Sequence, residues 1–546
     1  MERIRRSLAL CSAFLLAGTT AHSAPPRLER HGTAVQLLVQ GRPVLIVGGE
    51  LGNSSASSAA YMARYWPRLR QMHLNTVLAP VSWELIEPRE GQFNWSSVDT
   101  LLTQARAQRL HLILLWFGTW KNSMSTYVPA WVKRDQTRFP RAQLPDGRSL
   151  DILSAFNPAI QDADARAFTA LMGHLRSRDH AQNTVLMVQV ENEMGMLPLP
   201  RDHAAEAERR FRDRVPDELV RMLAVDTGED SYVRRIWQRN GAKRSGDWTE
   251  LFGEGDAAAE IFTAWHYARF SEAVAAAGKS AYALPMYVNA ALNRSNARPG
   301  EYPSGGPVPH LIDVWKAAAP SIDVIAPDIY FPDFVELAAR YHRPNNPLLV
   351  PEAGRADQQE VPANAFYAFG KLDALGFSPF SIESVDNQPM RQLAGAYGTL
   401  EQLAPFILAS QGLGRMSGFR PRVLGEGTVQ DAPVTETIGA FRFTVSFIDT
   451  QIPRALQNTA SHGGMIIEVG PEDYIVAGQG MIVTFEPSDD PGAQAGIDNV
   501  WEGSFDASGN WVPGRLLNGD QTHQGRHLRL PPGQFQIQRV RLYRYR

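Results

Sequence analysis

Short apolar runs alternate with amphipathic segments along most of the chain, from about residue 42 to residue 383. The apolar runs have the length of buried strands, and the segments between them carry apolar residues at helical spacing, which is typical of repeated βα units. The predicted strands are Val44–Gly49, Thr76–Val81, Leu110–Phe117, Thr184–Val190, Pro285–Ala290, Val324–Ile329, Pro347–Pro351 and Phe377–Ile382. The predicted helices include Ala60–Met72, Val98–Arg109, Ala163–Ser177, Ala257–Ala277 and Ala363–Leu375.

This alternation predicts an α/β fold of the (β/α)8 barrel type. An open doubly wound sheet is the alternative, and it is disfavoured because no glycine-rich nucleotide turn follows the first strand. Residues 197–255 interrupt the alternation after the fourth strand; they are highly charged, and we expect a helical insertion that covers the barrel mouth or packs on its rim. After about Gly414 alternating apolar segments follow without helices, which predicts an all-β sandwich. The expected organisation is a barrel over residues 25–413 and a sandwich accessory domain over 414–546.

The first residues have the pattern of an export signal. Three arginines within the first six residues precede an apolar run from Leu8 to Ala17, and residues 21–24, Ala-His-Ser-Ala, form a small-residue cleavage site. The apolar run is too short to span a bilayer. We therefore expect a signal peptide over residues 1–24 and a mature protein in the periplasm or the extracellular space.

Composition narrows the range of partners. The net charge of -3 leaves no excess of Lys and Arg to neutralise phosphates, so we expect neither a nucleic-acid nor a membrane partner. The single cysteine, Cys11, lies inside the expected signal, and the 13 histidines include no H-E-x-x-H spacing. We predict no metal and no cofactor. The 12 Trp and 15 Tyr suit a carbohydrate substrate, although most will be core residues, and the oligomeric state is left open.

Two glutamates follow apolar strands in a way that suits glycosidic bond cleavage. Glu193 ends the run Val-Gln-Val-Glu-Asn-Glu over residues 188–193, and Glu352 ends the run Pro-Leu-Leu-Val-Pro-Glu over residues 347–352. The ends of the fourth and seventh strands face each other across the mouth of a barrel, where the active sites of this fold lie. Retaining hydrolysis needs two carboxyl groups about 5–5.5 Å apart. A pair of solvated loop carboxylates is the alternative interpretation.

The motifs around these glutamates resemble those of clan A glycosidases, in particular glycoside hydrolase family 35, the β-galactosidases, with some similarity to the related family 42. The matching pieces are Gly48-Gly49, Asn75-Thr76-Val77, Trp83 with Glu87-Pro88 and Gly91, Pro129-Ala130-Trp131, Gln189 to Gly195, and Pro347-Leu348. The resemblance covers about residues 40–390, and it implies that Glu193 is the acid/base, Glu352 the nucleophile and Asn192 a sugar ligand. The sandwich resembles an accessory domain of bacterial members, some of them linked to xyloglucan breakdown.

The chain departs from this family at two places. Many members carry a tyrosine three residues before the tryptophan that matches Trp83, and here that residue is Pro80. Many members carry an Ala-Glu-Trp segment after the third strand, and here residues 118–122 read Gly-Thr-Trp-Lys-Asn. Sugar recognition at these positions therefore differs, and the departures indicate a subfamily.

Six further residues at strand ends are candidates for substrate binding: Glu50, Asn53, Glu87, Trp120, Tyr330 and Glu383. For Glu87 an ion pair, for Asn53 a turn role and for Trp120 simple packing are the alternatives. Tyr330 could donate a hydrogen bond to Glu352, and Glu383 could form a rim salt bridge instead.

The sequence thus predicts a retaining exo-β-galactosidase that acts on oligo- or polysaccharides, with the side chains of xyloglucan as one candidate. Two alternatives remain open. One is the same machinery with another sugar, such as a β-glucoside, a β-glucosaminide or an arabinoside. The other is a carbohydrate-binding protein without catalysis.

Overall fold

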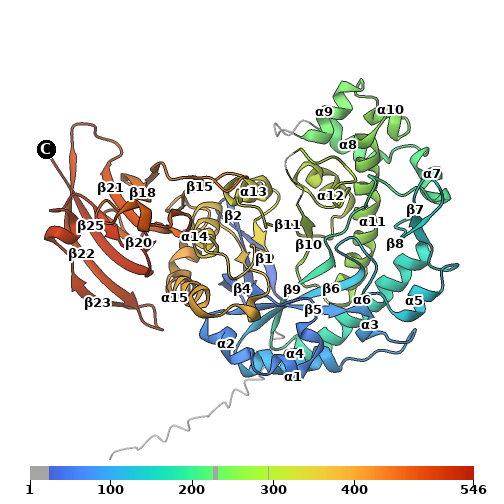
Figure 1. The fold of residues 1–546 in the computed structure, drawn as a ribbon, viewed down its shortest axis with the longest axis horizontal. Coiled ribbons are helices and arrows are strands. Elements are labelled where there is room, and N and C mark those ends of the chain that lie inside the picture. The colour runs from blue at the N-terminus through green and yellow to red at the C-terminus, as the bar shows by residue number, and fades with distance from the viewer. Residues whose placement is uncertain (1–23, 226–230, 293, 295) are drawn as a thin grey trace, which may run out of the picture.

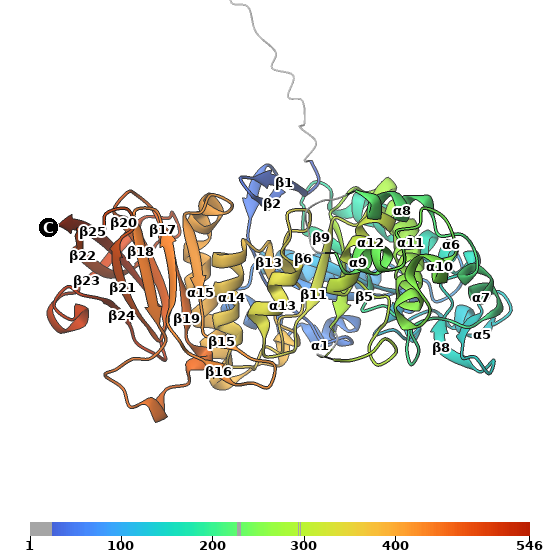
Figure 2. The same cartoon turned by 90° about the horizontal axis from the view of Figure 1, so that it is seen from above.

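The computed structural model describes residues 24–225, 231–292, 294 and 296–546. A barrel wrapped in helices and a C-terminal β-rich region, orange to red in Figure 1, lie side by side along the long axis. Helices α14 (Val361–Leu372) and α15 (Asn387–Ser410) stand between the two bodies (Figure 2). The expected signal peptide and Cys11 lie outside the described residues, apart from Ala24. Within the described ranges, no helix is both long enough and apolar enough to cross a membrane.

Eight parallel strands form one sheet that closes into a barrel. Its cyclic order is β4, β5, β6, β9, β10, β11, β12, β13, so neighbours along the chain are neighbours in space. The strands are β4 (Ile46–Glu50), β5 (Thr76–Ser82), β6 (His111–Lys121), β9 (Val185–Asn192), β10 (Met286–Ala291), β11 (Val324–Asp328), β12 (Leu349–Val350) and β13 (Gly376–Phe377). The ring closes between β11 and β12, where Asp328 and Glu352 form a parallel bridge. Each of the eight predicted strands has a counterpart, although the eighth, predicted over Phe377–Ile382, overlaps β13 only at Phe377. The predicted fold class is confirmed.

The helices form the outer layer of the barrel. They are α1 (Ala59–Met62), α2 (Trp66–Gln71), α3 (Trp83–Ile86), α4 (Ser96–Ala107), α5 (Ala130–Arg134), α6 (Pro158–Asp179), α11 (Asp256–Ala281), α12 (Ile312–Ala318), α13 (Phe334–Tyr341), α14 and α15. A small hairpin of β7 (Arg141–Gln143) and β8 (Ser149–Leu153) precedes α6. The helix predicted over Ala60–Met72 is split into α1 and α2, because Pro67 lies in the first turn of α2. Proline has no N–H to donate and clashes with the preceding turn, so one continuous helix cannot form.

A small antiparallel sheet covers the N-terminal end of the barrel. It consists of β1 (Arg27–His31), β2 (Ala34–Val39) and β3 (Arg42–Val44). Leu37 and Val39 of β2 share one buried cluster with residues of the barrel strands such as Ile46 and Leu349. The sequence analysis did not predict this sheet, because β1 and β3 are mostly polar and exposed. With this end covered, the mouth at the C-terminal ends of the strands is the open side.

The segment between β9 and α11 contains four short helices. They are α7 (Ala205–Phe211), α8 (Asp217–Ala224), α9 (Tyr232–Arg239) and α10 (Trp248–Phe252). Helix α8 packs on α12 and helix α10 packs on α11, so these helices thicken the outer layer on one side of the barrel (Figure 1). Their buried faces hold apolar residues such as Leu219 and Trp248, while arginine and glutamate side chains pair on the outside.

Two antiparallel sheets make up most of the C-terminal region. The larger sheet contains β14 (Met416–Phe419), β19 (Gly463–Glu468), β20 (Asp473–Gln479), β25 (Gln536–Tyr545), β22 (Gln494–Phe505) and β23 (Trp511–Leu516). The smaller sheet contains β17 (Val434–Ile438), β18 (Phe441–Ser446), β21 (Met481–Pro487) and β24 (Leu528–Leu530). A short pair, β15 (Arg422–Val423) and β16 (Val429–Gln430), lies beside them. Residues of both sheets share one buried cluster, as in a sandwich.

The larger sheet packs directly on barrel helix α14. A Cβ atom at Gly370 of α14 would lie 2.8 Å from the backbone nitrogen of Gly418 in β14, so glycine is required for this close approach. Phe366 of α14 stacks on Phe535 with ring centroids 5.4 Å apart. These contacts fix the sandwich against the barrel.

Candidate active site

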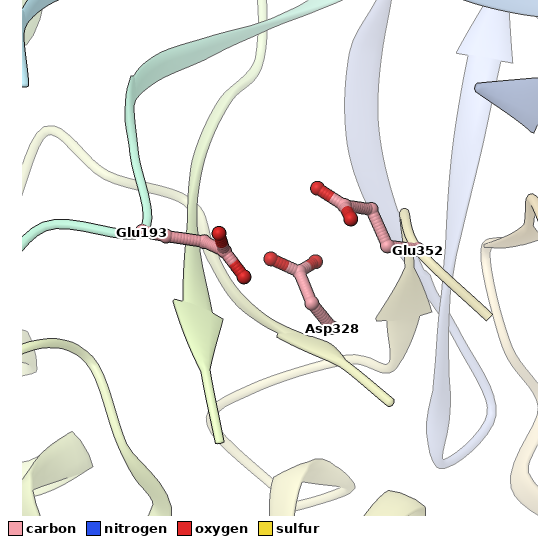
Figure 3. A group of neighbouring side chains, drawn as sticks. All are labelled: Glu193, Asp328 and Glu352. Carbon is pink, nitrogen blue, oxygen red and sulfur yellow. The ribbon is translucent and has the colours of Figure 1, made fainter. Parts of the chain in front are cut away.

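The two predicted glutamates lie together at the mouth of the barrel (Figure 3). Glu193 follows β9, and the backbone there adopts left-handed conformations at Glu191 (φ 60°) and Glu193 (φ 44°). Gly195 follows with φ 156°, and a Cβ atom there would lie 2.4 Å from the carbonyl carbon of Pro303. The chain therefore leaves the strand direction at a point where only glycine fits, and the side chain of Glu193 turns towards Glu352.

A third carboxylate, Asp328 at the end of β11, completes the group. Glu193, Asp328 and Glu352 are buried, and each offers one carboxylate oxygen such that the three oxygens lie within 4.8 Å of one another. Figure 3 shows the three side chains converging from separate strands. The structure thus brings Glu193 and Glu352 together as the sequence predicted, and it adds an acid that the sequence analysis missed.

Hydrogen bonds from neighbouring strands hold these carboxylates in place. The Asn122 amide group donates to Oε2 of Glu193, and the Tyr330 hydroxyl donates to Oε2 of Glu352. Asn289 of β10 connects two members of the group. Its Oδ1 accepts from the Glu193 N–H at 3.0 Å, and its Nδ2 donates to Asp328 Oδ2 at 2.6 Å.

Asn192, the predicted sugar ligand, is completely buried beside Glu193. Its Oδ1 accepts a hydrogen bond from Nζ of Lys121 at 2.8 Å. Its Nδ2 is buried and has no partner in the part of the chain that the structure describes. Buried polar groups are nearly always hydrogen-bonded, so this amide is a candidate donor for a ligand.

Burial and crowded negative charge raise the pKa values of the acids. The pKa of Glu193 rises to about 7, first because burial disfavours the ionised form and then because the Glu352 charge is close. The pKa values of Glu50 and Asp328 are raised well above their usual range, with burial as the largest cause and Glu352 as the second. At neutral pH the group therefore retains protons, and Glu193 is close to half protonated.

Glu50 belongs to this acidic group, as its place at the end of β4 predicted. It is completely buried, and neither of its carboxylate oxygens has a hydrogen-bond partner among the described residues. The nearby Glu352 charge adds to the effect of burial and raises the pKa of Glu50, because two ionised carboxylates repel each other. Asn53, three residues beyond Glu50, has a buried Oδ1 without a partner among the described residues. Both residues remain candidates for contact with a substrate.

Glu87 and Trp120 have structural roles, which corrects the prediction that they contact substrate. Both oxygens of Glu87 are occupied, since Oε2 accepts from Trp83 Nε1 at 2.8 Å and Oε1 from the Gly91 N–H at 2.7 Å. Trp120 is fully buried, its Nε1 donates to the Leu153 carbonyl oxygen at 3.1 Å, and it packs against aromatic rings of α11. Neither side chain has a face left for a sugar.

Glu383 and Tyr330 have different roles in the structure. Glu383 is buried and accepts from the Gly52 N–H at 3.0 Å and from the Ser55 hydroxyl, so it anchors the loop after β4. Among the described residues it forms no salt bridge. Tyr330 is 39% exposed and reaches Glu352 with its hydroxyl group. It therefore lies at the surface of the site, beside the candidate nucleophile.

The carboxylates of Glu193, Asp328 and Glu352 have the spacing of a metal site, but their hydrogen-bond donors argue against a bound metal. No other set of acidic, histidine or cysteine side chains among the described residues has such spacing. However, Asn122, Asn289 and Tyr330 each donate a hydrogen bond to one of these carboxylates, and the Lys121 charge is close. Donors that satisfy carboxylate oxygens compete with a cation, so we assign no metal here.

Besides Asn122, three residues that the sequence pattern does not single out contribute to the site. Asp328 and Asn289 stand near the C-terminal ends of their strands, and Lys121 ends β6. The signal that identified Glu193 and Glu352, a polar residue at the end of an apolar strand, is present at all three. No recognisable motif accompanies it there, so the sequence alone does not single these residues out.

The barrel with its paired glutamates resembles that of clan A glycoside hydrolases, and part of the chain is similar to a β-galactosidase family model. Residues 58–252 match the family model Glyco_hydro_42, described as β-galactosidase. Residues 393–529 match a domain of unknown function, DUF5597, which covers most of α15 and most of the sandwich. The motifs resemble family 35, whereas the matching model is that of family 42.

Several individual proteins with similarity are named β-galactosidases. A β-galactosidase from Xanthomonas manihotis is 29% identical over 221 residues, which are 38% of this chain and 33% of that protein. The chain thus matches about a third of the length of this curated relative. Among solved structures, the β-galactosidase from Rahnella sp. R3 has 17% identity and a TM-score of 0.46, covering 70% of this chain and 57% of that one. The enzyme from Marinomonas ef1 has 13% identity and a TM-score of 0.46, covering 66% and 60%.

Proposed function

We propose that this protein is a retaining exo-β-galactosidase with Glu352 as nucleophile and Glu193 as acid/base. The observation that carries the proposal is that one carboxylate oxygen of Glu193 and one of Glu352 lie within 4.8 Å of each other. Retaining enzymes hold the two carboxyl groups about 5–5.5 Å apart, and inverting enzymes hold them about 6.5–9.5 Å apart to admit a water molecule. The pair therefore favours double displacement.

In the first step Glu352 attacks the anomeric carbon while Glu193 protonates the departing glycosidic oxygen. Glu193 suits this task because its pKa of about 7 leaves a large fraction protonated at neutral pH. The Tyr330 hydroxyl, which donates to Oε2 of Glu352, leaves the other oxygen available for attack. The products of this step are the released aglycone and a glycosyl ester on Glu352.

In the second step Glu193 acts as a base and activates water to hydrolyse this ester. Ester formation removes the negative charge of Glu352, which is the second largest cause of the raised pKa of Glu193. The pKa of Glu193 therefore falls in the intermediate, and the residue loses its proton when a base is needed. One glutamate thus serves both steps.

The unsatisfied polar atoms of the site favour a neutral sugar rich in hydroxyl groups. Buried atoms without protein partners among the described residues, such as Asn192 Nδ2, Asn53 Oδ1 and Asp328 Oδ1, can be satisfied by sugar hydroxyls. Galactose is the sugar that the family similarity suggests. Because Pro80 and residues 118–122 depart from family 35, a β-glucoside, a β-glucosaminide or an arabinoside is the second candidate.

The test combines stereochemistry with two variants. Proton NMR of an aryl β-galactoside reaction should show β-galactose before mutarotation, and initial release of α-galactose would contradict the retaining mechanism. Glu352→Gln should fold normally and lose turnover by orders of magnitude; near-normal turnover would contradict its assignment. Glu193→Ala should slow poor leaving groups far more than activated aryl groups, whereas equal slowing would argue against an acid role.

The natural substrate and the location can be tested separately. A panel of nitrophenyl glycosides identifies the sugar, and lactose, galactosylated xyloglucan oligosaccharides and galactan identify the polymer class. Absence of hydrolysis with every compound would instead favour a binding protein. We also propose export by the segment 1–24, so that N-terminal sequencing of the mature protein should begin at Pro25.

A further inference from the structure

Lys121 is a buried cation at the edge of the acidic group. It ends β6, pairs in register with Asn192 of β9 and is 5% exposed. Its backbone is fixed by two hydrogen bonds with Met124, from Lys121 N–H at 2.8 Å and from Met124 N–H at 3.0 Å. The ammonium group lies 5.1 Å from the centroid of the Phe117 ring. These contacts hold both the main chain and the ammonium group of Lys121 in place.

The hydrogen bond of Lys121 determines which way the Asn192 amide faces. An ammonium group can only donate, so the amide must present Oδ1 to Nζ, 2.8 Å away. The NH2 end is then directed elsewhere, and it is this end that is buried without a partner among the described residues. Without Lys121 the amide could rotate and present an acceptor in place of a donor.

Lys121 also balances the charge around Glu193. Acids face Glu193 from three strands, namely Glu352, Asp328 and Glu50, while Asn122 and Asn289 contribute only neutral hydrogen bonds. Lys121 lowers the pKa values of Glu193, Asp328 and Glu50, although burial and the nearby Glu352 charge raise each of them by more. The charge of Lys121 therefore acts on the whole acidic group, although its ammonium group donates its hydrogen bond to the neutral amide of Asn192.

We propose that Lys121 is a positioning residue of this site, which fixes the Asn192 amide as a donor towards the sugar and supplies a positive charge that favours the ionised, base form of Glu193. This proposal rests on the proposed glycosidase function. It assigns a role to the segment 118–122, where the chain departs from family 35.

Lys121→Met tests both parts of the proposal, with Lys133→Met as the matched control, because Lys133 is partly exposed and pairs with Glu84 outside the site. Loss of the charge should raise the pKa of Glu193, so the alkaline limb of the pH profile of kcat/KM should move to higher pH. At the optimum, kcat/KM should fall about 10–100-fold, the range for a hydrogen bond to a charged group. Lys121→Arg, which keeps the charge, should restore the alkaline limb.

The amide orientation has its own readout. On a 2-deoxygalactoside, which lacks the hydroxyl next to the reacting carbon, Lys121→Met should lose less activity than on the galactoside. In an Asn192→Ala background, Lys121→Met should add little further loss but should still shift the alkaline limb. An unchanged alkaline limb in a folded Lys121→Met protein, or losses that simply multiply in the double variant, would overturn the proposal.

Failure of the function itself would look different. If the wild-type protein hydrolyses no glycoside, the proposed function fails, and the charge effect is then measured without substrate. A potentiometric difference titration of each protein against its Glu193→Gln counterpart gives the pKa of Glu193 directly. A higher value in Lys121→Met supports the charge role of Lys121, and an equal value refutes it.

Discussion

Replacing Glu193 by Gln should stabilise the protein at neutral and alkaline pH while it abolishes the acid/base function. The folded state raises the pKa of Glu193 from its usual 4.5 to about 7. Since a tenfold change in a proton-binding constant corresponds to about 1.4 kcal/mol, ionising this side chain in the folded protein costs about 3 kcal/mol relative to the unfolded chain. Glutamine avoids this penalty, because its amide has no charge to bury and can donate to the neighbouring carboxylates.

The sign of the effect sets its pH dependence. Because the folded pKa is raised, the favourable contribution of Glu193 is fully present below pH 4.5, where the group is protonated in both states. It is lost as the pH rises through about 7, and well above that pH the group is ionised in both states. The gain from Glu193→Gln should therefore be near zero at pH 4.5, grow between pH 5 and 7 and level off at about 3 kcal/mol.

Urea unfolding followed by tryptophan fluorescence measures this gain, because several tryptophans, such as Trp83, Trp116 and Trp120, are buried in the barrel. Curves for wild type and variant would be compared between pH 4.5 and 8.5. Glu29→Gln on exposed β1 serves as control and should leave the curves unchanged. A gain that does not vary with pH, or a loss of stability in Glu193→Gln at pH 8, would refute the electrostatic reasoning.

Three further predictions follow from the site. Tyr330→Phe removes the donor to Glu352, so kcat should fall about 10–100-fold in steady-state assays with little change in melting temperature; an unchanged kcat would contradict this role. Asp164 is the buried acceptor for Trp116 Nε1 and for the N–H and hydroxyl of Thr119. Calorimetry of Asp164→Ala should therefore show destabilisation by about 3 kcal/mol or more. Asp164→Asn keeps one acceptor oxygen and should lose less stability. Prolonged treatment with EDTA should leave activity unchanged, since the acidic group is held by protein donors; activity lost to EDTA and restored by a divalent cation would show that it binds a metal.

The barrel and its two central glutamates could be predicted because both depend on local patterns. Buried parallel strands are continuous apolar runs, and a charged residue that ends such a run must lie at the mouth. The repeated βα order then fixes which strand ends face each other. Glu193 and Glu352 followed from these two rules without any knowledge of distances.

Other parts of the site depend on backbone conformations that a pattern does not reveal. Glu191 and Glu193 are two residues apart, and in a regular strand they would share a face. Their positive φ angles break this rule, so that Glu191 accepts from the Trp120 N–H at 2.8 Å and lies against Asp164, while Glu193 faces the mouth. Similarly, the burial of Trp120 depends on how β6 packs against α11, which lies far away in the sequence.

The main chain at Glu352 seals the barrel independently of the carboxylate that it carries. Its carbonyl oxygen accepts from the Ile329 N–H at 2.8 Å, and the following N–H, of Ala353, donates to the Ser378 carbonyl oxygen at 2.9 Å. The chain segments that follow β11 and β13 are thus hydrogen-bonded to the backbone on either side of Glu352. The Glu352→Gln variant should therefore keep the barrel intact. It should also bind an uncleaved sugar long enough for a crystal structure of the complex.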